Sequence, residues 1–478
     1  MGGRWSSSTD SWSDVICPST EEVAARVRAS STTDIDQAVT AARRALATGD
    51  WAQRPFADRA EVVRRAADLV DPQAEEIGHL ITTEMGAPLA LFQVVAATHY
   101  MRSLADASDT LTLGEARPGW LAWALVEREP VGVVGSLAPW NGPFHLAAQK
   151  SIAALLAGCS VVFRPAAETP LDAFYLAEAL IEAGLPDGVL SVIPGGTEIG
   201  QYLVAHPGVD MVDFTGSTAA GRQIGATCGQ QLKRVHLELG GKSAAVVLDD
   251  ADVEQILPAL GQVFMNSGQV CAALTRVLAP TSMYDDVVDG LASVASSLHV
   301  GDPFDQTTEM GPLVSKRQLD RVKGYITRGE EEGAEVAFGG GTPAGLDCGF
   351  YVQPTVFSGV RNDMTIAREE IFGPVVCVIP YGDLDEAVAI ANDTPYGLHG
   401  GVFTADPTRG VDVARRLETG TVSVNSFTIN TDAPFGGRKC SGIGRENGPE
   451  GIGAFLEYKT INVAEDVARS YTSGAPVA

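Results

Sequence analysis

Apolar residues recur along this chain with two different periods. Residues 34–47 and 56–70 place alanine, valine and leucine at helical spacing among arginine, aspartate and glutamate, which predicts two amphipathic helices. Short runs rich in β-branched residues have the length of strands and lie at 131–137, 160–164, 189–193 and 211–214. A helical pattern over 171–183 separates two of these runs. Such alternation predicts a parallel sheet covered by helices.

A second alternating series begins after Gly241. Its predicted elements are strands at 244–248, 276–279, 375–379 and 421–424 and helices at 253–266 and 284–298. Two segments rich in glycine, proline and aspartate, 302–311 and 338–349, predict surface loops. Since 478 residues exceed one ordinary core, we expect two α/β lobes with a cleft between them.

Residues 111–129 fit neither series. Their mixture of glycine, proline and tryptophan predicts a protruding pair of strands. No segment repeats with a period of 20–50 residues, which argues against a solenoid or a propeller.

Charge and cysteine usage narrow the possible functions. A formal net charge of -26 would repel a phosphate backbone or an anionic bilayer, so we expect no nucleic-acid or membrane partner. The longest apolar run, 151–163, is also too short to span a bilayer. The seven cysteines form no CxxC pair, so we expect no metal site and no disulfide framework. Residues 1–14 lack the features of a signal peptide, and a reducing, cytoplasmic location fits best.

One cysteine stands in a context that suits a nucleophile. The segment 266–271, Asn-Ser-Gly-Gln-Val-Cys, ends a helical pattern on a glycine-containing turn, which can project the Cys271 thiol into a cleft near backbone amides. The alternative is a buried cysteine that acts as a small hydrophobic residue.

A carboxylate stands at the end of a predicted strand. In the segment 237–242, Leu-Glu-Leu-Gly-Gly-Lys, Glu238 lies between apolar neighbours, which predicts a raised pKa and suits a general base near neutral pH. The following glycines allow other backbone to approach closely. The alternative is a surface glutamate that pairs with Lys242 or Lys233.

Two further segments follow predicted strands. Asn141, in Pro-Trp-Asn at 139–141, lies where α/β active sites gather, and its amide can stabilise an oxyanion, although a simple turn is the alternative. The segment 214–221 opens a helix with small residues and free amides that suit a phosphate. It is not GxGxxG, so helix packing explains its small residues about as well.

These four segments, in this order, resemble the aldehyde dehydrogenase superfamily. The resemblance extends through Gly-Gly-x-Trp at 2–5 and through 184–189, 369–375, 392–398, 434–439 and 441–446, and so covers nearly the whole chain. It implies an α/β fold of three parts: a Rossmann-like coenzyme domain, a second α/β catalytic domain and a small β oligomerisation element. The corresponding boundaries are 1–111 with 131–240, then 241–456, and finally 112–130 with 457–478.

The resemblance also implies a chemistry. Cys271 attacks the aldehyde, Asn141 and the Cys271 backbone N–H form the oxyanion hole, and Glu238 activates the water that hydrolyses the thioester. Lys150 falls at a family position near the site, where a cation could support Asn141 or lower the thiol pKa.

NAD⁺ or NADP⁺ is the implied cofactor. The residues implied to bind it are Trp140, Arg164, Ala167, Gly216, Ser217, Gly240, Glu370 and Phe372. Arg164 replaces the usual lysine, and Ala167 replaces a frequent glutamate that would bind the ribose hydroxyl and repel a 2′-phosphate. Both departures predict that the enzyme uses both cofactors.

The implied substrate pocket is mainly apolar. Its residues are Gly142, Phe144, Leu146, Gln149, Val270, Ala272, Phe427 and Phe435. Gly142 and Gln149 stand where many relatives carry aromatic rings, which predicts room for a branched or longer aldehyde.

Two other functions are alternatives to a hydrolytic aldehyde dehydrogenase. A CoA-acylating semialdehyde dehydrogenase transfers the acyl group to CoA, but such relatives commonly lack a glutamate at the position of Glu238. A non-catalytic protein that kept the fold would be free to lose Cys271, Glu238 and Asn141, which are all present. By similarity we also expect a homodimer or a homotetramer.

Overall fold

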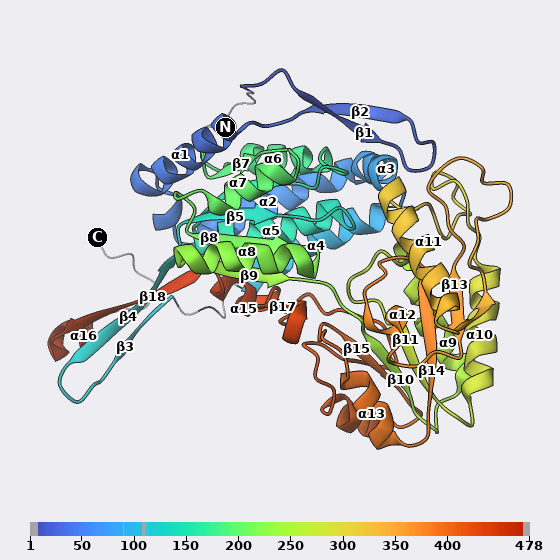
Figure 1. Cartoon of the computed structure of the whole chain (residues 1–478). Coiled ribbons are helices and arrows are strands. Elements are labelled where there is room, and N and C mark those ends of the chain that lie inside the picture. Colours follow the sequence, from blue (N-terminus) through green and yellow to red (C-terminus); the bar gives the residue numbers. More distant parts are fainter. Residues whose placement is uncertain (1–7, 89, 108–110, 112, 472–478) are drawn as a thin grey trace.

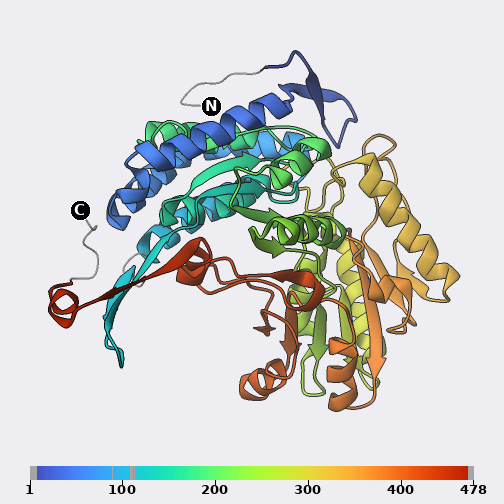
Figure 2. The ribbon, with the colours of Figure 1, turned by 60° about the vertical axis from the view of Figure 1, so that its left-hand side comes forward.

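A computed structural model describes residues 8–88, 90–107, 111 and 113–471. The chain forms two α/β lobes, and a thin arm projects from one side of the first lobe (Figures 1 and 2). The N-terminal Gly-Gly-Arg-Trp segment that contributes to the resemblance lies outside the described residues. Within the described ranges, no helix is long and apolar enough to cross a membrane.

The first lobe is built on a six-stranded sheet with the order β17-β9-β8-β5-β6-β7. Its strands are β5 (Val133–Leu137), β6 (Ser160–Arg164), β7 (Leu190–Val192), β8 (Met211–Thr215), β9 (Arg234–Glu238) and β17 (Gly442–Ile443). Strands β5 to β9 pair in parallel, which confirms the predicted parallel sheet. The added strand β17 is antiparallel and comes from the range expected to belong to the catalytic domain, so the chain crosses back beside β9.

Helices cover both faces of this sheet because successive strand residues point to opposite sides. Val133 packs in one core and its neighbour Val134 in another. The first face is covered by α1 (Thr32–Thr48), α7 (Thr197–Ala205) and α8 (Thr218–Gln231). The second is covered by α2 (Phe56–Val70), α3 (Ala74–Met85), α4 (Leu91–Asp106), α5 (Pro143–Ala157) and α6 (Asp172–Glu182), with the short helices η1 (Trp51–Gln53) and η2 (Asp71–Gln73) nearby.

The second lobe carries a seven-stranded sheet with the order β12-β13-β14-β11-β10-β15-β16. Its strands are β10 (Ala244–Val247), β11 (Arg276–Pro280), β12 (Glu335–Phe338), β13 (Thr355–Ser358), β14 (Val375–Tyr381), β15 (Gly400–Phe403) and β16 (Ser423–Val424). One face packs on α9 (Val253–Leu260), η4 (Gly261–Gly268) and α10 (Tyr284–Ser297). The other packs on α11 (Lys316–Glu331), α12 (Thr365–Arg368), α13 (Leu384–Asn392) and α14 (Pro407–Ala414).

The helix predicted over 253–266 is wrong in its second half. Regular α-helix ends at Leu260, and a 3₁₀ segment follows in which Asn266 and Ser267 both have a φ of 54°. This left-handed backbone interrupts the helical pattern and turns the chain toward Cys271. The strand predicted over 421–424 shrinks to the two residues of β16 because only Ser423 and Val424 pair with β15.

The predicted strand pair at 111–129 is confirmed and gains a third strand. Strands β3 (Gly114–Arg117), β4 (Trp123–Pro130) and β18 (Leu456–Val463) form an antiparallel sheet, and α16 (Glu465–Ser470) lies at its end (Figure 1). An N-terminal hairpin, β1 (Trp12–Ile16) with β2 (Val23–Arg28), was not predicted. The remaining short elements are η5 (Lys439–Ser441) and α15 (Gly448–Gly453).

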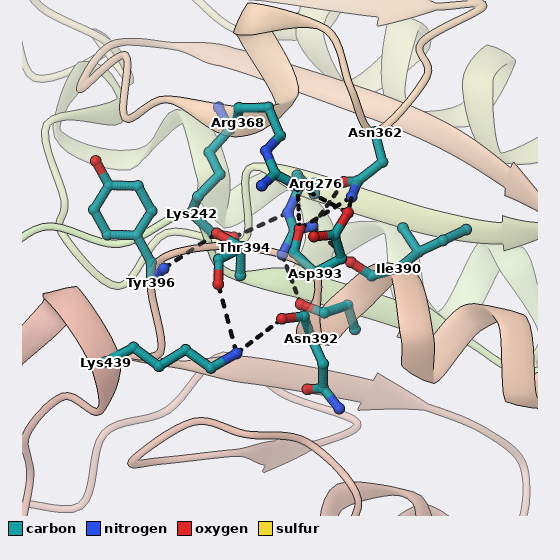
Figure 3. Close-up of polar contacts among 11 residues, drawn as sticks. Lys242, Arg276, Asn362, Arg368, Ile390, Asn392, Asp393, Thr394, Tyr396 and Lys439 are labelled. Carbon is teal, nitrogen blue, oxygen red and sulfur yellow. Dashed lines mark hydrogen bonds and ion pairs between the residues drawn. The ribbon is translucent and has the colours of Figure 1, made fainter.

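A buried arginine ties distant segments of the second lobe together. Arg276 is 1% exposed and donates to the carbonyls of Lys242, Ile390 and Ala391 and to Asn362 Oδ1, at 2.9–3.0 Å (Figure 3). These bonds join the chain that leaves Glu238 to the segment that leads to Leu398.

Candidate active site

A left-handed turn presents Cys271. Asn266, Ser267 and Gly268 have φ values of 54°, 54° and 70° in succession. A side chain at Gly268 would overlap the backbone at Gly373, so only glycine fits this turn. The buried Gln269 side chain fixes the loop, because it donates to Asn266 O at 3.1 Å and accepts from Val314 N at 3.0 Å. Cys271 follows two residues later and is half-buried.

Asn141 joins this loop from the other lobe. It lies between β5 and α5, and its Nδ2 donates to Gln269 O at 3.0 Å. Asn266 Nδ2 in turn donates to the Asn141 carbonyl at 2.8 Å. An amide nitrogen carries two hydrogens, so one of those on Asn141 can serve a ligand while the other holds the loop.

Cys271 rests as a thiol. Burial, together with the carboxylates of Glu370, Glu238 and Glu446, raises the pKa of Cys271 to about 12. The charges that act most on the thiol are negative, so the expected lowering of its pKa by Lys150 is not seen. A nucleophilic thiolate requires a base that removes the proton during the reaction.

Glu238 is the last residue of β9 and is 3% exposed. Neither of its carboxylate oxygens has a hydrogen-bond partner among the described residues. Burial raises the pKa of Glu238 to about 7, and the nearby carboxylate of Glu446 adds to this shift. The raised pKa agrees with the prediction from the sequence. The alternative of a surface ion pair is wrong, since Lys233 Nζ donates to the carbonyls of Val204 and His206 instead.

Lys150 belongs to a buried cluster of charges next to Glu238. Its Nζ donates to Asp213 Oδ1 at 2.8 Å and to Glu446 Oε1, while Asn141, its expected partner, is held by Gln269. Asp213 Oδ1 also lies 2.9 Å from His236 Nδ1. Asp213, His236 and Glu446 have metal-ligating groups within 4.8 Å of one another, but the ammonium of Lys150 already forms ion pairs with two of them.

The sequence analysis missed Asp213 and His236, although a signal existed. His236 stands two residues before Glu238 on one strand, so both side chains point to the same face of the sheet. Asp213 is the register partner of His236 on the neighbouring strand.

Apolar residues surround the thiol. Ala272, Leu398 and Phe435 form a small buried cluster against which Cys271, Phe427 and Ile429 pack. The structure therefore brings Ala272, Phe427 and Phe435 to Cys271, as predicted, and adds Leu398 and Ile429. Val270 packs on the neighbouring core that Phe427 also touches.

Only some of the pocket residues predicted in and just before α5 have positions that suit a pocket. A side chain at Gly142 would lie 3.5 Å from Leu146, so these two positions adjoin. Phe144 is fully buried in the core of the first lobe and does not line a pocket. Gln149 is buried and donates to Asn447 Oδ1 at 3.1 Å, so its contacts do not support the expected pocket role.

The residues predicted to bind the dinucleotide lie along two features. Ser217 is exposed and caps α8, accepting from Ala220 N at 3.3 Å, and Gly216 precedes it. Trp140 and Phe372 form an edge-to-face pair with centroids 5.3 Å apart. Glu370 accepts from Gly241 N at 3.2 Å, and a side chain at Gly240 would overlap its carboxylate. The N-terminus of α8 suits a pyrophosphate, and the Glu370 carboxylate suits the hydroxyls of a ribose.

Arg164 and Ala167 occupy the start of the loop after β6. Arg164 donates through Nε and Nη2 to Gly195 O at 3.0 and 2.7 Å, which uses part of its fork of donors. Burial lowers the Arg164 pKa, with Glu168 and Glu198 opposing. Glu168, which could have paired with Arg164, lies 3.0 Å from Arg317 instead.

Known proteins are similar to this chain over nearly its whole length. Residues 5–461 match the model of the aldehyde dehydrogenase family. The chain is 46% identical over 470 residues to geranial dehydrogenase of Castellaniella defragrans, covering 96% of this chain and 97% of that protein. It is 42% identical to the putative aldehyde dehydrogenase DhaS of Bacillus subtilis, with coverages of 94% and 91%.

Solved structures agree. The aldehyde dehydrogenase of Mycobacterium tuberculosis complexed with NAD⁺ superimposes with a TM-score of 0.95 at 45% identity, covering 99% of this chain and 98% of that one. A mutant of aldehyde dehydrogenase C from Pseudomonas syringae in complex with NAD⁺ and octanal gives 0.93 at 40% identity, with coverages of 96% and 95%. The chain therefore belongs to the aldehyde dehydrogenase family, whose members oxidise aldehydes to acids with a nicotinamide cofactor.

Proposed function

We propose that this enzyme oxidises an aldehyde to its carboxylic acid through a thioester on Cys271. The observation that carries this assignment is the convergence of three groups from both lobes. Asn141 is bonded to the loop that presents Cys271, Glu238 is close enough to raise the pKa of the thiol, and an apolar cluster lies beside the sulfur. This set supplies a nucleophile, an oxyanion donor and a base.

The acylation step uses all three groups. Glu238 accepts the Cys271 proton while the sulfur bonds to the aldehyde carbon. The second amide hydrogen of Asn141 and the Cys271 backbone N–H donate to the oxygen that becomes negative. Such a donor contributes about 3 kcal/mol of transition-state stabilisation. When bound, NAD⁺ accepts the hydride that leaves the same carbon.

Hydrolysis then regenerates the thiol. Glu238 first releases the thiol proton to solvent and then accepts a proton from water, whose oxygen bonds to the thioester carbon, while the same oxyanion donors act again. The bond from carbon to sulfur breaks, and the sulfur is protonated as the acid departs. A carboxyl with a pKa of about 7 suits both directions of this transfer near neutral pH.

We further propose the first lobe as the coenzyme domain and the second as the catalytic domain. Ser217 and Gly216 would hold the pyrophosphate at α8, Glu370 the ribose, and Trp140 with Phe372 the walls around the nicotinamide. NAD⁺ is the preferred cofactor in this proposal. NADP⁺ is tolerated because Ala167 presents no carboxylate and Arg164 Nη1 donates no hydrogen bond among the described residues.

The substrate class we propose is a longer or branched apolar aldehyde. Leu146, Phe427, Phe435, Leu398 and Ile429 offer hydrocarbon surface, and Gly142 adds no side chain. The named substrate of geranial dehydrogenase and the octanal bound to aldehyde dehydrogenase C have this chemistry.

The decisive test is Cys271→Ala, assayed by NAD⁺ reduction with short, longer and branched aldehydes. We expect wild type to prefer the longer chains and the variant to lose turnover while it still binds cofactor. Turnover within tenfold of wild type would reject Cys271 as the nucleophile. Acyl-CoA as the main product in the presence of CoA would reject the hydrolytic route.

We also propose a cytoplasmic homodimer or homotetramer. The seven cysteines are free, which fits a reducing compartment. Trp120 and Leu121, at the tip between β3 and β4, are 93% and 86% exposed, and Tyr458 on β18 is 65% exposed. Such apolar exposure on an arm indicates an interface. Light scattering that detects monomer alone would contradict it.

A further inference from the structure

We propose that His236, anchored by Asp213, is a positioning residue that holds the Glu238 carboxylate in place and keeps it ionised. This inference rests on the proposed role of Glu238 as the general base. It assigns a function to two buried residues that the reaction itself does not use.

Sheet geometry brings the three side chains together. Asp213 on β8 and His236 on β9 are register partners, and Glu238 follows His236 by two residues on the same face. The His236 ring spans the two carboxylates. Its Nδ1 lies 2.9 Å from Asp213 Oδ1, and its Nε2 lies 3.4 Å from Glu238 Oε1. All three residues are at most 3% exposed.

The imidazole carries a positive charge at neutral pH. The Asp213 carboxylate and the contact with Glu238 outweigh burial and raise the pKa of His236 to about 9. An imidazolium donates from both nitrogens, so it can hold Asp213 with one and attract Glu238 with the other. Asp213 therefore fixes both the orientation and the charge of the ring.

Other charges around Glu238 do not replace this contact. Lys150, from α5, is bonded to Asp213 and Glu446, and Arg445 donates to the carbonyls of Gly437 and Gly444. Glu446 raises the pKa of Glu238 further, Lys150 lowers it, and the nearby Cys271 is a neutral thiol. The titratable and charged groups around Glu238 are Lys150, Arg445, Glu446 and Cys271 together with His236 and Asp213. His236 makes the one ion pair to the Glu238 carboxylate among the described residues.

The contact is also loose enough for catalysis. At 3.4 Å it is an ion pair rather than a short hydrogen bond, and both Glu238 oxygens have no hydrogen-bond partner among the described residues. A carboxylate held by charge alone can accept a proton without first breaking a strong bond. Removing the charge would raise the Glu238 pKa and leave the base protonated at neutral pH.

His236→Gln tests this directly, because glutamine is neutral at every pH. The acid limb of the kcat profile should move up by at least one pH unit, so that kcat falls at least about fivefold at pH 7 and recovers by pH 9. The burst of NADH that forms in the first turnover at pH 9 should keep its wild-type amplitude. A matched control is His145→Gln, which removes a buried imidazole that burial keeps neutral by lowering its pKa to about 4. Its profile should not move.

A second variant covers the case in which His236→Gln fails to fold. Asp213→Asn with His236→Gln replaces the charged pair by two amides that can still bond to each other, and leaves Lys150 paired with Glu446. The same alkaline shift is expected.

Two outcomes would overturn the inference. An unmoved acid limb would show that His236 does not control the Glu238 charge, and an equal loss at all pH values would show a purely structural role. Glu238→Gln, run in parallel, separates the two proposals. If it turns over normally, the role of Glu238 as the base fails; if it loses turnover while His236→Gln behaves as wild type, only the present inference fails.

Discussion

Arg276 and Glu238 are both buried and ionisable, yet their surroundings differ sharply. Arg276 donates four hydrogen bonds, three of them to carbonyls, all at 2.9–3.0 Å (Figure 3). Glu238 has one ion-pair partner, and among the described residues no hydrogen bond reaches its oxygens. The first group is saturated by fixed dipoles and the second is left unsatisfied.

This difference indicates what each group does. Saturation removes the cost of burying a charge and makes Arg276 a tie between segments distant in sequence. An unsatisfied carboxylate destabilises the fold but gains a pKa of about 7, which chemistry at neutral pH requires. Stability and reactivity are therefore assigned to different buried charges, on neighbouring stretches of one chain.

Of the substitutions that test this difference, Glu238→Gln should have the largest effect on activity. We expect steady-state turnover to fall about a thousandfold or more, because Glu238 is the base in both acylation and hydrolysis, and we expect any acyl group that still forms to stay on Cys271. Mass spectrometry of the reacted protein measures the adduct. Undiminished turnover with no adduct would assign the base elsewhere.

The same variant should not lose stability. Burial raises the Glu238 pKa from 4.5 to about 7, so the ionised form costs stability increasingly between those values and fully above pH 7. Urea unfolding at pH 8 should therefore find the variant as stable as wild type or more so.

Arg276→Met should show the opposite pattern. Three carbonyls and Asn362 lose their donor, so we expect a loss of about 3–5 kcal/mol in the free energy of unfolding, with kcat per folded molecule changed less than about threefold. Arg361→Met is a matched control, since Arg361 is 63% exposed and pairs with Asp363. A loss below about 1 kcal/mol, by urea unfolding, would refute the role of Arg276 as a tie.

The dependence of wild-type kcat on pH tests whether the unsatisfied Glu238 carboxylate is the base. Glu238 acts as a base only when ionised, so kcat should fall about tenfold for each pH unit below its pKa of about 7. The residual rate of Glu238→Gln should lack this limb. A limb centred near pH 4.5 would show that Glu238 is solvated in the working enzyme.

The smallest expected effect concerns Arg164, whose guanidinium uses only part of its hydrogen-bond donors within the protein. With two of its nitrogens on Gly195 O, we expect kcat/KM for NAD⁺ and NADP⁺ to stay within about 100-fold of each other. Arg164→Gln should reduce use of NADP⁺ about tenfold more than use of NAD⁺. Arg43→Gln, an exposed residue of the same lobe that pairs with Asp210, is the control. An unchanged ratio would place Arg164 away from the 2′-phosphate.

Much of this protein was determined by local patterns in the sequence. The period of apolar residues predicted both α/β lobes, since strands and helices select their buried faces residue by residue, whereas the arm was predicted from a segment that fitted neither series. The segments around Cys271, Glu238 and Asn141 implied the chemistry through their resemblance to a known family, and the apolar neighbours of Glu238 alone predicted its raised pKa.

What only the tertiary structure decided depends on contacts between distant segments. The helix over 253–266 ends early because loop contacts of Gln269 and Gly268 override local helical preference. Lys150 was expected beside Asn141 but binds Asp213 and Glu446, the latter 296 residues away. The pairing of β8 with β9 places Asp213 beside His236. Which buried charges meet, and which remain unsatisfied, follows from strand order and domain packing, and no local pattern encodes either.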